Sequence, residues 1–252
     1  MFGRSERPAL VMLHGLEDHW QSWRPLADRL ADRFRCYAPD LPWHAGSEYR
    51  WGTWATAAQW IDEALALVPD VSVVVAHSLG AVALLRWLAA DPSHGLGAIV
   101  LLAPFYRTQS TTIQPLEQTI VDIRSAARGA IRGRLGDRVD HIEPDVLDLM
   151  VAKMFERMGP HGLLAISDIF LSTSGADLTG NSTPIFVLAG TDDEGIRRDR
   201  ADALAKDIPN TEIVLRDDLS HFCHSQQPDR VHDLIVEFLN RALPEHNSKE
   251  IR

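Results

Sequence analysis

The sequence has few cysteines and no long apolar run. Only two of its 252 residues are cysteines, Cys36 and Cys223, too few for the disulfide framework of a small secreted protein. No stretch approaches the roughly 18 continuous apolar residues that a membrane-spanning helix needs, and residues 1–7 lack the apolar core of a signal peptide. These absences predict a cytoplasmic protein without a membrane span.

The chain also lacks an excess of positive charge. It has 25 Lys and Arg against 35 Asp and Glu, for a formal net charge of −10. Binding to a phosphate backbone needs clustered Lys and Arg, whereas the arginines here are spread among acidic residues. Nucleic acid is therefore not expected as a partner. With 45% hydrophobic residues, no internal repeat and no low-complexity stretch, the chain has the composition of a globular protein with a large core.

Short apolar runs recur along the chain and predict a parallel sheet. Such runs, bounded by turn residues, are typical of buried parallel strands. Six strands are predicted, at 10–13, 34–38, 71–76, 98–103, 184–189 and 211–215. Helical periodicity is clearest at 23–31, 53–68, with Thr53 or Thr56 as its N-cap, 79–90 and 227–243. Strands that alternate with helices predict the α/β class, with a mostly parallel six-stranded sheet flanked by helices.

One long segment interrupts this alternation. Between residues 105 and 183 the pattern is helical, at 116–134, 145–158 and 163–171, and contains no convincing strand. We therefore expect a core domain formed by 1–104 and 184–252, with 105–183 inserted as a helical lid. Ligands of parallel sheets bind beyond the carboxyl ends of the strands, under whatever covers them. The site is therefore expected beneath the lid.

The segment Ala76–Gly80 places a serine between the third strand and the helix that follows it. Ser78 has small residues two positions before and two positions after it, in an A-x-S-x-G frame. This is the pattern of a nucleophile elbow, a turn so tight that the flanking side chains must be small. A serine becomes a nucleophile only when a base reaches its hydroxyl, and a serine in such a turn can also be purely structural. The elbow therefore needs partners elsewhere in the chain.

Candidate partners follow two later strands. Asp193 comes directly after the fifth strand, and His221 follows the sixth. Because the carboxyl ends of parallel strands meet at one edge of the sheet, these side chains and Ser78 are predicted to converge there. A base must reach the nucleophile, and a third group must orient the base. The loop His14–Leu16, after the first strand, can offer a backbone N–H to the same edge.

These segments resemble the α/β-hydrolase superfamily over nearly the whole chain. The resemblance implies a Ser-Asp-His triad without a cofactor or metal, and an oxyanion hole formed by the backbone N–H groups of Leu16 and Leu79. It places the acid at Asp193 rather than Asp192, three residues after Gly190. The first strand begins so early that the two antiparallel strands often seen before it are expected to be missing, which leaves an all-parallel sheet. The matching segments are 13–15, 39–42, 76–80, 190–193 and 220–221.

Three departures from the family pattern concern the turn and the pocket. Ala76 stands where the elbow often has its first glycine, and Ser220 stands where a glycine usually precedes the base. Trp43 replaces a glycine near the mouth of the site, so the pocket is expected to have a different shape there. Trp43, His44 and Trp51 are predicted to line an apolar substrate pocket.

The sequence thus predicts a serine hydrolase of the carboxylesterase or thioesterase type. Its partner would be a small, largely apolar acyl ester or thioester, cleaved through an acyl-enzyme intermediate by a monomer or homodimer. Acyl transfer, a lyase step or a cyclisation could use the same triad, and the pocket could instead bind a small molecule without turnover. Epoxide hydrolase and dehalogenase chemistry is disfavoured, because those relatives carry an aspartate at the position of Ser78.

Overall fold

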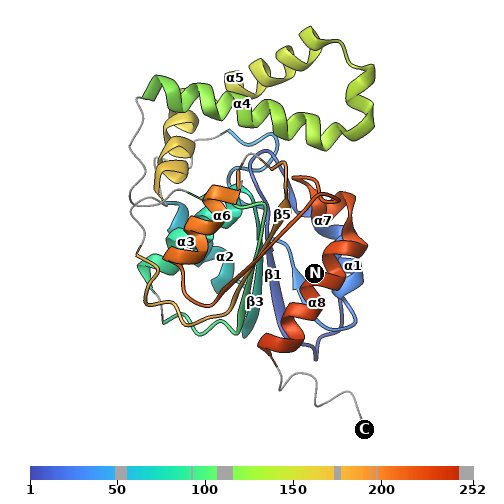
Figure 1. The fold of residues 1–252 in the computed structure, drawn as a ribbon, viewed down its shortest axis with the longest axis vertical. Coiled ribbons are helices and arrows are strands. Elements are labelled where there is room, and N and C mark those ends of the chain that lie inside the picture. Colours follow the sequence, from blue (N-terminus) through green and yellow to red (C-terminus); the bar gives the residue numbers. More distant parts are fainter. Residues whose placement is uncertain are drawn as a thin grey trace.

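Six parallel strands form the sheet at the centre of the protein, in the order β2-β1-β3-β4-β5-β6 (Figure 1). The computed structural model describes residues 1–48, 56–91, 93–106, 116–172, 177–193, 195–196 and 198–243. Every pairing between the described strands is parallel, so the predicted fold class is confirmed. The strands are β1 (Ala9–Leu13), β2 (Arg35–Tyr37), β3 (Val71–His77), β4 (Ala98–Leu102), β5 (Ile185–Gly190) and β6 (Thr211–Arg216).

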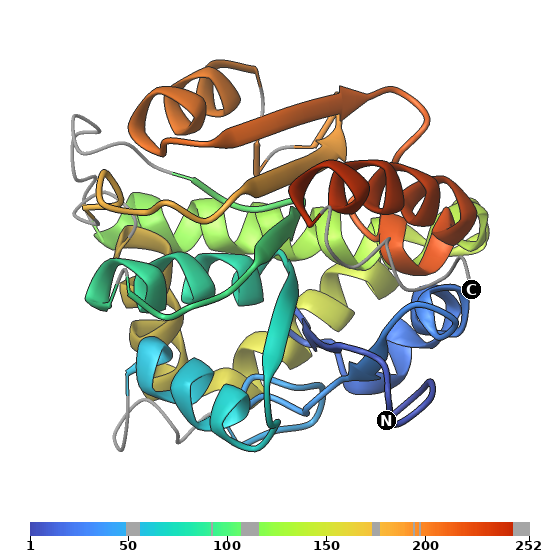
Figure 2. The same ribbon diagram turned by 90° about the horizontal axis from the view of Figure 1, so that it is seen from below.

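Alternate side chains of the strands enter two cores, one on each face of the sheet. In β1, Val11 and Leu13 belong to one core, whereas Leu10 and Met12 belong to the other. Because helices cover both faces, the central strands β1, β4 and β5 are continuous apolar runs rather than alternating ones. The first core is covered by α2 (Ala57–Ala66), α3 (Leu79–Ala90) and α6 (Arg198–Asp207). Figure 2 shows α1 (Arg24–Leu30) and α8 (Pro228–Ala242) on the opposite face, where the short elements η1 (Trp20–Trp23) and α7 (Cys223–Gln226) precede them.

The helix ends follow from local sequence. α2 begins after Thr56, whose hydroxyl accepts a hydrogen bond from the Gln59 N–H, while the Gln59 side chain accepts one from the Thr56 N–H. This capping box satisfies two N–H groups that the first helical turn leaves without partners. Of the two predicted N-cap residues, Thr56 is the one that caps α2. The other, Thr53, lies outside the described residues. α8 begins with Pro228 and buries Val231 and Ile235, which lie one helical turn apart.

All the regular elements in the described residues between β4 and β5 are helices. They are α4 (Leu116–Leu135), the short η3 (Gly136–His141) and α5 (Pro144–Ser172). α5 breaks at Gly159, whose φ of 58° is left-handed, and Pro160 follows it. Figure 1 shows that these helices extend across one end of the sheet, and we call residues 116–172 the cap. None of the helices in the described ranges combines the length and the apolarity that a membrane crossing requires.

Candidate active site

Ser78 occupies a strained turn between β3 and α3. Its φ of 50° and ψ of −117° are unusual for a residue with a side chain, and such conformations cost roughly 1–3 kcal/mol. The surrounding backbone holds the turn in place. The Ser78 N–H donates to the Leu102 carbonyl over 3.0 Å, and the Ser78 carbonyl accepts from the N–H groups of Ala81 and Val82. The side chain is thereby presented at the carboxyl edge of the sheet.

Close backbone approach explains the small residues around Ser78. A Cβ on Gly80 would lie 2.6 Å from the His14 carbonyl oxygen and 2.7 Å from that of Leu13. A Cβ on Gly15 would lie 3.0 Å from the Cβ of Ser78. Any larger residue at Gly80 would therefore push α3 away from β1. Ala76 is completely buried in the core, so the alanine that replaces the usual glycine fits there.

His221 links Ser78 to Asp193. Its Nε2 lies 3.1 Å from Ser78 Oγ, and its Nδ1 lies 2.7 Å from Asp193 Oδ2. Because a carboxylate only accepts, Nδ1–H donates to Asp193 and leaves Nε2 free to accept from the serine hydroxyl. The other oxygen of Asp193 accepts from the Gly195 N–H over 2.8 Å. The Asp193 side chain is buried, whereas Asp192, the alternative acid, is exposed.

Two contacts fix the loop that carries His221. A Cβ on Gly190 would lie only 2.3 Å from the Leu219 carbonyl oxygen, so the end of β5 and the loop after β6 touch. His77 lies behind the elbow, and its Nε2 is 2.8 Å from the His221 carbonyl oxygen. Burial lowers the pKa of His77 well below its ordinary value, so the neutral ring donates to that carbonyl through Nε2–H. The backbone of His221 is therefore fixed from two directions.

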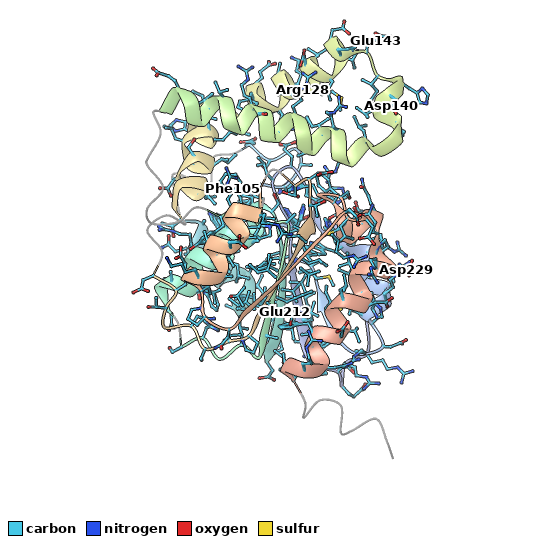
Figure 3. All side chains as sticks on the ribbon, viewed as in Figure 1. Phe105, Arg128, Asp140, Glu143, Glu212 and Asp229 are labelled. Carbon is cyan, nitrogen blue, oxygen red and sulfur yellow. The ribbon has the colours of Figure 1, made fainter. Side chains whose placement is uncertain are left out.

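A cavity of about 600 Å³ opens above Ser78 and His221. Its wall on the cap side is mainly apolar and includes Ile123, Ile131 and Met154. On the core side it includes Phe105, which Figure 3 shows on the part of the core that faces the cap. Asp140 and Glu143 lie at the far end of the cap in the same view. The site thus lies between sheet edge and cap, and the cavity is large enough for a small organic molecule.

A family model, that of the alpha/beta hydrolase family, matches residues 10–234. The chain belongs to this family. A curated relative, the pimeloyl-[acyl-carrier protein] methyl ester esterase of Aromatoleum aromaticum, is 26% identical over 241 residues, which cover 88% of this chain and 94% of the relative.

Two solved structures have the same fold as this hydrolase. An N-acyl homoserine lactone degrading enzyme superposes with a TM-score of 0.69 at 21% identity, covering 94% of each chain. The thioesterase domain from the curacin biosynthetic pathway superposes with a TM-score of 0.64 at 16% identity, covering 94% of this chain and 93% of that domain. At these identities the likeness concerns the fold.

The two predicted oxyanion donors of the hydrolase belong to segments that adjoin Ser78. Leu79 is the first residue of α3, where a helix leaves its N–H groups without internal partners. Leu16 follows Gly15, which packs directly against the elbow. Within the described part of the chain, neither N–H donates to a backbone or side-chain acceptor. Both groups are therefore available to a substrate oxygen.

Of the three predicted pocket residues, the two that the structure describes are not part of the cavity wall. Trp43 is fully buried in the core, and its Nε1–H donates to the His14 carbonyl over 3.0 Å. The indole thus supports the loop after β1 from behind instead of facing the cavity. His44 is half-buried, with its Nδ1 3.0 Å from the Leu41 carbonyl oxygen, and is not part of the wall. Trp51 lies outside the described residues. The cap supplies the apolar wall instead.

A buried polar cluster behind the elbow was not predicted from the sequence. Asp18, His77 and His224 are completely or almost completely buried, and their ligand atoms lie within 4.8 Å of one another. Two imidazoles and a carboxylate can bind a metal ion. However, Asp18 Oδ1 already accepts from Arg134, and Oδ2 accepts from the Ser22 hydroxyl over 2.8 Å. The charge of this carboxylate is therefore balanced by the guanidinium of a cap residue.

The protonation states of the cluster follow from its burial. Burial lowers the pKa of His224, so its imidazole is neutral. Burial alone would raise the pKa of Asp18, but the His224 imidazole, 3.6 Å away, and the Arg134 guanidinium hold it well below its usual value. Asp18 is therefore an anion inside the protein, in contact with the cap. A single aspartate in a polar loop carries no sequence signal of this role.

Proposed function

We propose that this α/β hydrolase is a serine hydrolase that cleaves a carboxylic ester or thioester of a small, largely apolar acyl substrate. One observation carries the proposal: an unbroken hydrogen-bonded chain runs from Asp193 through His221 to Ser78, at the base of a cavity. In this arrangement each group has a role that acyl transfer to water requires, namely a nucleophile, a base and a residue that orients the base.

The reaction would begin at the Ser78 hydroxyl. As Oγ attacks the acyl carbon, His221 Nε2 takes its proton and the carbonyl electron pair moves onto oxygen. When the tetrahedral intermediate collapses, the alcohol or thiol leaves with the proton from His221. The same steps with water in place of Ser78 then release the acid. Asp193 holds Nδ1–H throughout and stabilises the imidazolium that forms twice in each cycle.

The negative oxygen of both intermediates would be bound by the N–H groups of Leu16 and Leu79. A donor aimed at such an oxygen contributes about 3 kcal/mol to transition-state stabilisation, because it is oriented before the charge develops. The positive end of the α3 dipole adds to this effect at Leu79. The strained turn at Ser78 is consistent with a site in which the backbone itself takes part in the chemistry.

The wall of the cavity indicates the kind of acyl group. The cap contributes Ile123, Ala127, Ile131 and Met154, which favour an alkyl or aryl chain over a strongly polar one. The curated relative is a methyl ester esterase, so an oxygen ester with a small alcohol is the first substrate to test. Thioesters of the same acids test whether the leaving group is restricted.

Two other functions use the same residues. An acyltransferase, lyase or cyclase would form a different product from the same triad, and analysis of products with and without a competing acceptor separates these reactions from hydrolysis. A protein that only binds a small molecule would react once with a fluorophosphonate at Ser78 but would not turn over esters.

The test is a panel of acyl methyl esters and acyl thioesters assayed with the wild type and Ser78→Ala. Loss of the nucleophile should lower kcat at least about 10³-fold. Ser125→Ala is the matched control, because Ser125 also lines the cavity but lies on α4. Activity of Ser78→Ala close to that of the wild type would contradict the proposal, whatever the control shows.

A further inference from the structure

The loop that carries Leu16 is tied to the cap by two arginines from different helices. We call residues 14–18 the oxyanion loop. Arg134, near the end of α4, donates through Nη1 to the Glu17 carbonyl over 2.6 Å and through Nη2 to the Asp18 carboxylate. Arg157, on α5, pairs with the Glu17 carboxylate. One guanidinium thus binds both backbone and side chain of the loop.

The conformation of the oxyanion loop is unfavourable without such contacts. Glu17 has a φ of 54°, in the left-handed region that residues with side chains avoid. The Asp18 N–H reaches the Gly15 carbonyl only at 3.3 Å, so the turn inside the loop is weakly bonded. On the core side the loop is held by the Glu17 N–H, which donates to the Trp43 carbonyl over 3.0 Å. On the cavity side it is held by the cap.

The buried negative charge of Asp18 requires a cationic partner, and Arg134 is in contact with it. The Asp18 side chain is completely buried, whereas that of Arg134 is 40% exposed and lines the cavity. A buried carboxylate that loses its cationic partner becomes an uncompensated charge, which forces the surrounding structure to rearrange or to admit water. The guanidinium also lies 5.3 Å from the centre of the Phe222 ring, next to His221. Loss of Arg134 would therefore remove contacts with the oxyanion loop and with the Phe222 ring beside His221.

We propose that Arg134 is a positioning residue: with the cap in place, its guanidinium holds the oxyanion loop so that the Leu16 N–H faces the substrate oxygen. This inference rests on the proposed function. It makes the oxyanion hole a composite of core and cap, complete only when the cap helices lie over the sheet edge. Arg134 itself need not touch the substrate.

The experiment compares Arg134→Met, Arg134→Lys and Arg128→Met with the wild type, using an ester that the wild type hydrolyses. Three quantities are measured: kcat, KM and the affinity for a trifluoromethyl ketone that carries the same acyl chain. Ser78 adds to this ketone, and the resulting oxyanion occupies the oxyanion hole. Arg128 is the matched control, because it lies on the same helix but pairs with Asp148 inside the cap.

Arg134→Met should lower kcat about 10- to 100-fold with little change in KM, and should weaken ketone binding by the same factor. Arg134→Lys should recover part of this loss, because an ammonium can reach the Glu17 carbonyl or the Asp18 carboxylate but not both with fork geometry. Arg128→Met should behave as the wild type. If Arg134→Met does not fold, as judged by circular dichroism, Arg134→Lys carries the test with the same readouts and a smaller loss.

An unchanged kcat, or a loss confined to KM with normal ketone affinity, would overturn the inference and leave Arg134 as a residue that merely attaches the cap. Ser78→Ala, assayed in parallel, separates this failure from that of the proposed function. If Ser78→Ala loses activity while Arg134→Met keeps it, only the positioning role is wrong. If Ser78→Ala remains active, both are wrong.

Discussion

The sheet edge and the cap contribute to the same site by different means. At the edge, backbone contacts that leave no space for a Cβ at Gly80 or Gly190 fix the positions of Ser78 and His221. The cap contributes apolar walls and a few charged contacts, and it exposes large apolar side chains such as Leu149 and Leu164 to solvent. Under the proposed function, the edge would carry out the chemistry and the cap would select the acyl group.

The largest effect should come from the edge, in Asp193→Asn. The amide keeps the shape of the side chain but favours the wrong tautomer of His221, because its NH₂ can donate to Nδ1. We expect kcat to fall about 10⁴-fold, while binding of a non-reactive substrate analogue in the cavity stays unchanged. Steady-state kinetics and calorimetric titration measure the two quantities.

Asp192→Asn is the matched control for this prediction. Asp192 also lines the cavity, but its side chain is exposed, and it is Asp193 that contacts His221. Equal losses of kcat in the two variants would mean that Asp193 is not the residue that orients His221. The roles assigned to the residues at the sheet edge would then need revision.

A smaller effect, on the pH dependence of the free energy of unfolding, should come from the buried imidazoles at the edge. Burial lowers the pKa of His14, His77 and His224 in the folded state. Their stabilisation is therefore present above the unfolded-state pKa of about 6.5 and is lost as the pH falls below it, because the unfolded chain binds more protons. Each of these histidines contributes a slope of up to about 1.4 kcal/mol per pH unit.

Urea denaturation between pH 7.5 and 5 measures this slope. His224→Gln should reduce it. The same substitution at His141, an exposed residue of the cap, is the control for the chemical change itself. A free energy of unfolding that stays constant over this range would show that the buried imidazoles are not neutral in the folded state.

The sheet could be predicted because its four central strands, β1, β3, β4 and β5, are largely apolar on both faces. All six predicted strands are found in the structure within about two residues of their expected bounds. α6 could not be predicted in this way. Its sequence, Arg198–Asp207, is mostly charged, and among the side chains whose burial the structure describes only Ala201 and Leu204 are buried. A helix with so narrow an apolar stripe has little periodic signal.

The sequence indicated the three site residues that follow the ends of strands. Ser78, Asp193 and His221 each come directly or within a few residues after a strand, so a parallel sheet brings them together. Asp18 and Arg134 are 116 residues apart and belong to a loop and a cap helix, whose relative placement depends on tertiary packing. The position of Trp43 in the chain predicts a pocket residue, but its side chain is buried in the core, where Nε1–H donates to the His14 carbonyl.

The most direct test of this account is whether Ser78 carries the acyl group during turnover. The measurement is intact-protein mass spectrometry after rapid acid quench of the wild type with its ester, followed by peptide mapping. The account predicts one added acyl group per chain, on the peptide that contains Ser78, with release of the alcohol in a burst. Alcohol release with no adduct, or an adduct on another residue such as Ser125 or Ser220, would contradict it.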